Sequence, residues 1–362
     1  MAPNVADDDS ALTESIRGEG RMLDRRATLK GLGAGIALGI AGFGNTVRAQ
    51  PSSMPVRSAL AAPGLSFAGL YVAKRRELWT RNGVDMTLKL VQGGPLAMVA
   101  LTTQEADFVS TASTDPMIGW DRGLKTVVIA AFTGALTMQF TARKEWMERS
   151  GAGPKSPLEA KVKALKGARV GVSTIGGGPA QYTRHLATMF GIDPERDMKL
   201  LAVGFGPARI AALRQNQVDL ITGSPPEADQ VFLEGFGDLF LNCATEVPLF
   251  REFPFTVALV TAQTAGQRSE MTSRIGRTLG QANDLIHSNF GEVVDILRSE
   301  FPKIDPRAIE RSMERDKDSF PQGARMTETM WHNGIVVSSA LKTIKNSPPE
   351  REGEFWTNKF LQ

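Results

Sequence analysis

Short apolar runs alternate with amphipathic stretches after residue 50, and this alternation constrains the fold more than any other feature of the chain. The runs are rich in Val, Ile, Leu or Phe, and most end at Gly, Pro, Ser or Thr, which is typical of strands. We expect strands at residues 56–62, 84–91, 106–112, 126–132, 169–174, 199–203 and 218–222. Strands that alternate with helices form mostly parallel sheets covered by helices, so the sequence predicts an α/β fold.

Helices are expected between these strands and throughout the C-terminal part. The first spans residues 69–82 and ends at Gly83, because glycine stops helices well. Pro95 begins the next one, where its missing N–H costs nothing. From Gly266 onward the pattern is helical only, with helices expected at 269–289, 292–299, 305–316 and 324–345.

Two apolar segments indicate that the chain crosses between two lobes. Segment 137–142 comes shortly before a Gly- and Pro-rich linker at 151–157, and segment 255–261 precedes the helical tail. If both segments run between lobes, the middle third folds as a lobe of its own. Two crossings suit a hinge that closes on a ligand. The expected division is 55–141 and 255–362 for lobe 1, and 142–254 for lobe 2.

The first 49 residues resemble a twin-arginine export signal. Arg25 and Arg26 stand just ahead of an apolar run at 31–44 that contains six glycines. This run is shorter than the roughly 18 apolar residues that a bilayer span needs. Val47-Arg48-Ala49 supplies small residues where a signal peptidase cleaves, so we expect cleavage after Ala49 and a product in the bacterial periplasm. The alternative is a glycine-rich tail on a cytosolic protein.

Composition excludes several classes of partner and cofactor. The formal net charge is +3, and the leader carries equal numbers of basic and acidic side chains, so the mature chain keeps a mild charge. We therefore expect no nucleic acid or anionic membrane surface as partner. Cys243 is the one cysteine in the sequence and lies far from the cleavage site, so an internal disulfide and a lipid anchor at that site are excluded. We expect it to be a small buried apolar residue rather than a reactive thiol. Three scattered histidines lack zinc-ligand spacing, and no cofactor is expected.

The loop after the expected strand 169–174 is the strongest candidate for ligand binding. Ligands of open α/β sheets bind beyond the carboxyl ends of strands, near helix N-termini. Three glycines, Gly176, Gly177 and Gly178, allow close approach of the backbone, and the free N–H groups of the helix that follows suit an anion. Thr174 adds a hydroxyl. A plain strand-to-helix turn is an equal alternative.

The same rule selects further residues in the other loops that follow expected strands. Phe67 and Phe205 are candidates to stack on a planar ligand, or else belong to the core. Glu227 is a candidate acceptor for an amine or heterocycle, or a solvated carboxylate, and Arg209 is expected on the surface more readily than at an acidic ligand. The remaining candidates are small or hydroxyl-bearing: Ser66, Gly94, Ser113, Thr114, Thr133, Gly134 and Ser224.

Catalytic patterns are incomplete, so we do not expect an enzyme. Segment 171–175 lacks the final glycine of a nucleophile elbow. Gly204-Phe205-Gly206 starts a dinucleotide fingerprint, but Arg209 stands where its third glycine belongs. An exported enzyme of another kind stays an alternative.

Several stretches carry a family resemblance between about Val56 and Leu361. They are Leu70-Tyr71-Val72-Ala73-Lys74, Asn82-Gly83-Val84-Asp85, Gly93-Gly94, Leu165-Lys166-Gly167-Ala168-Arg169-Val170-Gly171-Val172 and Gln217-Val218-Asp219. Their order and spacing resemble solute-binding proteins of ABC transporters of the nitrate/sulfonate/taurine type, whose fold is shared with thiamine-pyrimidine synthases. Gln104 and Asn216 stand at turn positions where that family usually has glycine.

The resemblance implies a two-lobed type II periplasmic-binding-protein fold with two mixed sheets flanked by helices and joined by a two-strand hinge. It implies a monomer that captures a small solute and delivers it to ABC permease and ATPase subunits, after export by the twin-arginine translocation machinery. Among the candidates, it places Ser66, Gly94, Ser113, Thr114, Thr174, Gly177 and Ser224 in the cleft. The expected solute is a sulfonate, nitrate or organic carboxylate. Recognition of a planar nitrogen heterocycle, for a sensor or another type of transporter, is the alternative.

Overall fold

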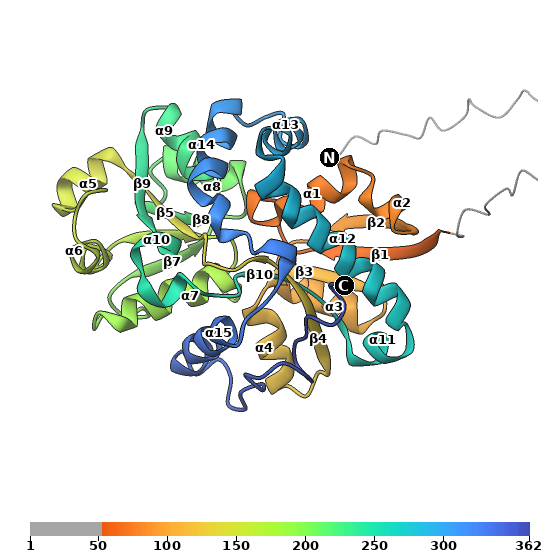
Figure 1. Cartoon of the computed structure of the whole chain (residues 1–362). Helices are drawn as coiled ribbons and strands as arrows, with labels where there is room; N and C mark the ends of the chain where they lie inside the picture. Colours follow the sequence, from red (N-terminus) through yellow and green to blue (C-terminus); the bar gives the residue numbers. More distant parts are fainter. Residues whose placement is uncertain (1–52) are drawn as a thin grey trace, which may run out of the picture. The chain divides into compact units, whose positions relative to one another are not determined.

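The computed structural model describes residues 53–362, so the expected export signal and its cleavage site lie outside the described residues. The described chain is α/β and contains two five-stranded mixed sheets flanked by helices, as expected (Figure 1). Apart from β9, every named strand overlaps a segment that the sequence indicated as a strand or a crossing segment. No helix in residues 53–362 is long and apolar enough to cross a membrane.

The first sheet, here sheet A, has the strand order β2-β1-β3-β10-β4. Strands β1, β2 and β3 pair in parallel, whereas β10 is antiparallel to both of its neighbours. The strands are β1 (Met54–Leu60), β2 (Val84–Leu90), β3 (Phe108–Ala112), β4 (Thr126–Thr133) and β10 (Thr256–Thr261). The strand that returns from the second sheet is therefore inserted between two strands of the first, which ties the start and end of the chain into one sheet.

The second sheet, sheet B, repeats this arrangement in the order β7-β6-β8-β5-β9. Here β5 is the antiparallel strand and pairs with β8 and β9. The strands are β5 (Gln139–Arg143), β6 (Arg169–Val172), β7 (Lys199–Ala202), β8 (Leu220–Gly223) and β9 (Gly237–Asn242). Strand β9 was not predicted, because its apolar part is only the short run 239–241 between a Gly-Asp pair and Asn242.

The chain leaves sheet A after Thr133 and enters sheet B at Gln139. This crossing comes earlier than the division at residues 141 and 142 that the sequence suggested, because all of β5 pairs within sheet B. The return crossing lies between Phe250, which ends a short 3₁₀ helix, and Thr256, which begins β10. The two crossings run side by side, since Gly134 accepts a hydrogen bond from the backbone of Phe253 at 2.8 Å.

Helices lie between the strands, as the alternating pattern predicts. The expected helix 69–82 is wrong as a single element, because Glu77 adopts a left-handed conformation (φ 53°) and divides it into α1 and α2. Gln104 and Asn216 also have positive φ angles, as their turn positions suggested. The helices up to β10 are α1 (Ala68–Arg75), α2 (Leu78–Arg81), α3 (Gly94–Thr102), α4 (Thr114–Asp121), α5 (Lys144–Ser150), α6 (Leu158–Lys163), α7 (Gly178–Met189), α8 (Pro207–Arg214), α9 (Glu227–Leu233) and α10 (Cys243–Glu246).

The helical tail contacts both sheets' helices rather than the first lobe alone (Figure 1). Helix α12 packs on α1 and β4, and α13 also packs on α1. In contrast, α14 packs on α9, and α15 contacts both α4 and α7. Assigning all of 255–362 to lobe 1 was therefore too simple. The tail comprises α11 (Ala262–Gln267), α12 (Ser269–Ser288), α13 (Phe290–Glu300), α14 (Pro306–Asp316) and α15 (Glu328–Ala340).

Candidate functional site

A small cavity of about 70 Å³ lies where the carboxyl ends of strands from both sheets meet. Sheet A contributes the ends of β1 and β3, and sheet B contributes the ends of β6 and β8. This is where ligands of open α/β sheets bind. Seven of the predicted site residues line the cavity: Phe67, Gly94, Thr174, Gly177, Gly178, Phe205 and Ser224.

The start of α7 forms one wall of the cavity. Gly177, Gly178 and Pro179 all line it, and Gly177 donates its backbone N–H to the carbonyl of Thr174 at 3.3 Å. A Cβ atom on Gly177 would lie 2.5 Å from the Thr174 hydroxyl oxygen, so only glycine fits against this turn. The start of a twelve-residue helix thus lies against the cavity, and helix starts of this kind stabilise bound anions. Pro179 has no N–H and the Gly177 N–H is bonded within the turn, so Gly178 supplies the backbone amide of this wall.

Elements of the two sheets touch at several places next to this cavity. The backbone N–H of Leu65 donates to the carbonyl of Pro225 at 3.2 Å. The Ser113 and Tyr182 hydroxyl oxygens lie 3.4 Å apart. A Cβ atom on Gly178 would come within 2.8 Å of the Ala112 Cβ atom. The cavity is therefore bounded by contacts between elements of sheet A and elements of sheet B.

Four predicted site residues lie beside the cavity rather than on its wall. Ser113 and Thr114 begin α4 and face Tyr182 and Gly178. Gly176 lies farther out and lines the outer groove described below. Glu227 does not line the cavity, because Arg209 donates from Nε to one of its carboxylate oxygens at 2.8 Å and from Nη2 to the other.

This pair corrects two expectations. Arg209 was expected on the surface and Glu227 was expected at a ligand or in solvent, but both are buried. Each carboxylate oxygen of Glu227 accepts a hydrogen bond from Arg209, so this side chain is engaged within the protein rather than at the cavity.

Three other predicted residues lie at the crossings between the sheets. The Ser66 hydroxyl is 2.8 Å from that of Thr137, and Thr133 Oγ1 is 2.8 Å from Thr256 Oγ1. A Cβ atom on Gly134 would lie 2.5 Å from the terminal methyl of Met330. These residues hold the crossing segments together, and none of them lines the cavity.

Asp115 lines the cavity although it was not among the predicted site residues, which include its neighbours Ser113 and Thr114. It is only 7% exposed and accepts a hydrogen bond from the Thr111 hydroxyl. Burial raises the pKa of its carboxyl group to about 6. A Cβ atom on Gly94 would lie 1.9 Å from a carboxylate oxygen of Asp115, so the start of α3 fits directly against this side chain. The available signal was an acidic residue three positions after a strand end, at the start of a helix.

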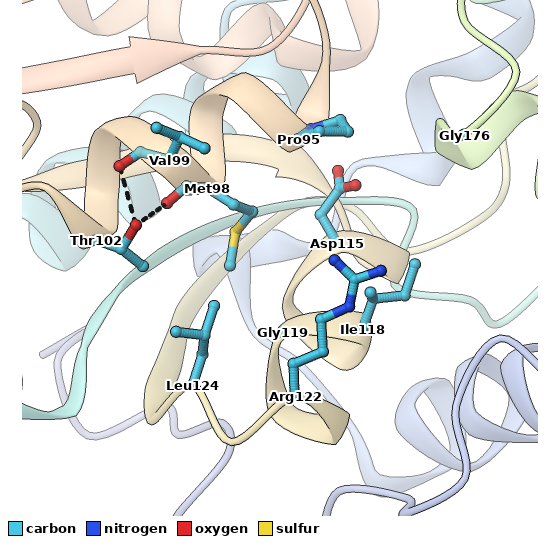
Figure 2. A pocket seen from close by; sticks show the side chains of 10 residues that line it. All are labelled: Pro95, Met98, Val99, Thr102, Asp115, Ile118, Gly119, Arg122, Leu124 and Gly176. Atoms are coloured by element: carbon cyan, nitrogen blue, oxygen red, sulfur yellow. Dashed lines mark hydrogen bonds between the residues drawn. The ribbon is translucent and has the colours of Figure 1, made fainter.

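Asp115 also lines a second, larger space outside the cavity. Figure 2 shows this outer groove, of about 400 Å³, between α3 and α4. Its walls are mainly apolar, with Met98 and Val99 from one helix and Ile118 from the other. The Asp115 carboxylate points toward the start of α3 near Pro95 (Figure 2). The cavity and the outer groove therefore meet at one buried carboxylate.

No group of three or more His, Cys, Asp or Glu side chains suited to hold a metal ion occurs within residues 53–362. Cys243 is buried, and burial raises the pKa of its thiol. The chemistry of the cavity therefore lies in backbone amides, hydroxyl groups, aromatic rings and the Asp115 carboxylate.

Comparison with known proteins identifies the family. Residues 62–293 match the family model described as NMT1-like. The chain belongs to the NMT1-like family.

Relatives of this NMT1-like protein are distant in sequence and similar in fold. It is 22% identical over 288 residues to YtlA of Bacillus subtilis (strain 168), itself assigned as a binding protein only provisionally; the match covers 76% of this chain and 80% of YtlA. A structure from Bordetella bronchiseptica RB50 matches with a TM-score of 0.72 at 18% identity, over 85% of this chain and 95% of the other. A second structure is that of the alkanesulfonate-binding protein SsuA from Xanthomonas axonopodis pv. citri bound to MOPS. It matches with a TM-score of 0.61 at 17% identity, over 83% of this chain and 96% of SsuA.

These matches confirm the resemblance seen in the sequence and the fold that it implied. The NMT1-like protein has the fold of the periplasmic binding proteins of ABC-type import systems.

Proposed function

We propose that this NMT1-like protein is the solute-binding component of an ABC-type importer. It captures a small solute in the cavity between the two sheets and delivers it to a membrane permease. The observation that carries this proposal is the composition of the cavity wall, which combines strand ends from both sheets. A solute bound there contacts both lobes at once, and only a ligand with higher affinity for the closed state drives closure.

The proposed solute carries an acidic group, such as a sulfonate, nitrate or organic carboxylate, seated at the start of α7. Support comes from the close-fitting Gly177 and Gly178 turn, which allows an oxyanion to approach backbone amides. The similarity to an alkanesulfonate-binding protein agrees with this chemistry.

A thermal-shift screen tests the proposal. Residues 50–362 are mixed with a panel of small acids, sulfonates and pyrimidines. A solute at 100 times its dissociation constant adds about 2.7 kcal/mol to the free energy of unfolding, enough for a clear rise in melting temperature. Thr174→Ala should weaken the shift given by an acidic hit. A panel in which only solutes without an acidic group bind would contradict the proposed class.

We further propose that the protein acts in the periplasm after export through the twin-arginine pathway. Arg25 and Arg26 ahead of the glycine-rich run support this route. N-terminal sequencing of the periplasmic protein should begin at Gln50, and changing both arginines to lysine should leave the precursor uncleaved in the cytoplasm. Cleavage and export that persist in this variant would contradict the route.

A further inference from the structure

Six carboxylates are buried among residues 53–362, and one of them lacks an ion-pair partner there. Each of the other five carboxylates has at least one arginine within ion-pair distance. The pairs are Asp107 with Arg57 and Arg268, Asp219 with Arg169 and Arg149, Glu227 with Arg209, Asp229 with Arg311 and Arg315, and Asp316 with Arg315 at 3.6 Å. Asp115 is the exception, and it is the buried carboxylate that lines the cavity.

This difference matters because a buried charge is costly unless it is paired. The fold provides arginine for the other five carboxylates, so pairing is the rule in this chain. Asp115 instead has the Thr111 hydroxyl as a donor and the glycine start of α3 against it. The same burial that leaves it unpaired raises the pKa of its carboxyl group.

Asp115 is open to the cavity and to the outer groove, since it lines both. On its own helix, Arg122 lines the outer groove without forming an ion pair to it in the described structure. From α7, the titratable group that faces it is the Tyr182 hydroxyl, whose pKa is raised mainly by burial. The start of α3 contributes glycine and proline, which carry no charge.

We propose that the solute itself supplies the missing partner, as an N–H donor that binds the Asp115 carboxylate. This inference rests on the proposed function and narrows its solute class. The solute then carries two features: an acidic or acceptor group at the start of α7 and an ammonium or ring-amine N–H at Asp115. A simple inorganic anion such as nitrate meets only the first requirement.

A first experiment needs no solute. The urea unfolding of Asp115→Asn and Asp219→Asn is compared with that of the wild type at about pH 7.5. Because Asp219 has arginine partners and Asp115 has none, Asp219→Asn should lower the unfolding midpoint, whereas Asp115→Asn should leave it unchanged or raise it. Equal loss of stability in the two variants would show that Asp115 already has its partner within the protein, and would overturn the proposal.

A second experiment uses matched pairs of probes that differ by one amino group: 2-aminoethanesulfonate with ethanesulfonate, and 4-aminopyrimidine with pyrimidine. Calorimetry on the wild type should show at least tenfold tighter binding of an amino member than of its partner. Asp115→Asn should remove this preference, and Asp85→Asn, a change of an exposed aspartate on β2, should keep it. The two pairs distinguish an ammonium from a ring amine.

The two possible failures are distinguishable. Ethanesulfonate that binds as tightly as its amino analogue, or a preference that survives in Asp115→Asn, overturns the role of Asp115 and leaves the proposed function standing. Binding by the pyrimidines with none by the sulfonates contradicts the proposed acidic solute, while the unfolding comparison still decides whether Asp115 is unpaired.

Discussion

The guanidinium of Arg209 donates to both carboxylate oxygens of Glu227, and the pair lies directly beneath Gly223 at the end of β8. A Cβ atom on Gly223 would lie 2.3 Å from one of these oxygens and 2.9 Å from Nη2 of Arg209. The pair thus fills the space under the loop that presents Ser224 to the cavity. Its role is to support this loop.

Breaking this pair should lower stability strongly. Glu227→Gln leaves the buried Arg209 uncompensated, so we expect a loss of about 3–5 kcal/mol in the free energy of unfolding, measured by urea titration. Arg214 and Glu234 form an exposed pair nearby, and Glu234→Gln should cost at most about 1 kcal/mol. Similar losses in the two variants would contradict the structural role assigned to the buried pair.

Gly178 should control closure of the two lobes around the solute. A Cβ atom there would lie 2.8 Å from the Ala112 Cβ atom and 3.2 Å from the Thr114 hydroxyl oxygen. Gly178→Ala should therefore hold the elements of the two sheets apart and weaken solute binding at least tenfold, or about 1.4 kcal/mol, by calorimetry.

The matched control is Gly176→Ala, because an added Cβ atom at Gly176 meets no atom of the described structure within 4 Å. The affinity of Gly176→Ala for the solute should stay within about twofold of the wild-type affinity. That factor corresponds to a change of less than about 0.5 kcal/mol in the binding free energy. If both variants bind as the wild type does, the close approach of Gly178 to Ala112 has no part in binding.

Asp115 should give the ligand-free protein a specific dependence of stability on pH. Its carboxyl pKa is raised from 3.8 to about 6, mainly by burial. Between these values the folded chain binds more protons than the unfolded chain, so this group lowers stability as pH rises through the window. The free energy of unfolding of Asp115→Asn should therefore equal that of the wild type below about pH 4. Above about pH 6 it should exceed the wild-type value by at most about 3 kcal/mol.

Urea titrations of the wild type and Asp115→Asn at several pH values measure this gain. Asp316, whose carboxyl pKa burial also raises to about 6, is present in both proteins and cancels in the difference. A difference in stability that does not change with pH would contradict the unpaired, buried state of Asp115.

The sequence predicted the parts of the site that follow from strand ends. Thr174, Gly177 and Ser224 were found because each follows a strand whose carboxyl end faces the cavity. The same rule also selected Thr133 and Gly134, which do not line the cavity, because the chain continues from β4 into the crossing toward sheet B. The local pattern of an apolar strand followed by Thr-Gly does not distinguish these two situations.

Other features depend on packing that the sequence does not display. Arg209 and Glu227 are eighteen residues apart, and their pairing requires the starts of α8 and α9 to meet beside Gly223 at the end of β8. An acidic residue at a helix start is ordinarily solvated, so Asp115 gave no sign of burial. Its burial requires the approach of Gly94, which is 21 positions away in the sequence.

The radius of gyration of residues 50–362, measured by small-angle X-ray scattering with and without saturating solute, tests the central claim most directly. The protein is first unfolded and refolded by dialysis to remove any co-purified solute. Closure around a solute that contacts both lobes predicts a smaller radius for the wild type and little change for Gly178→Ala. An unchanged wild-type radius with a solute that calorimetry shows to bind would contradict the account.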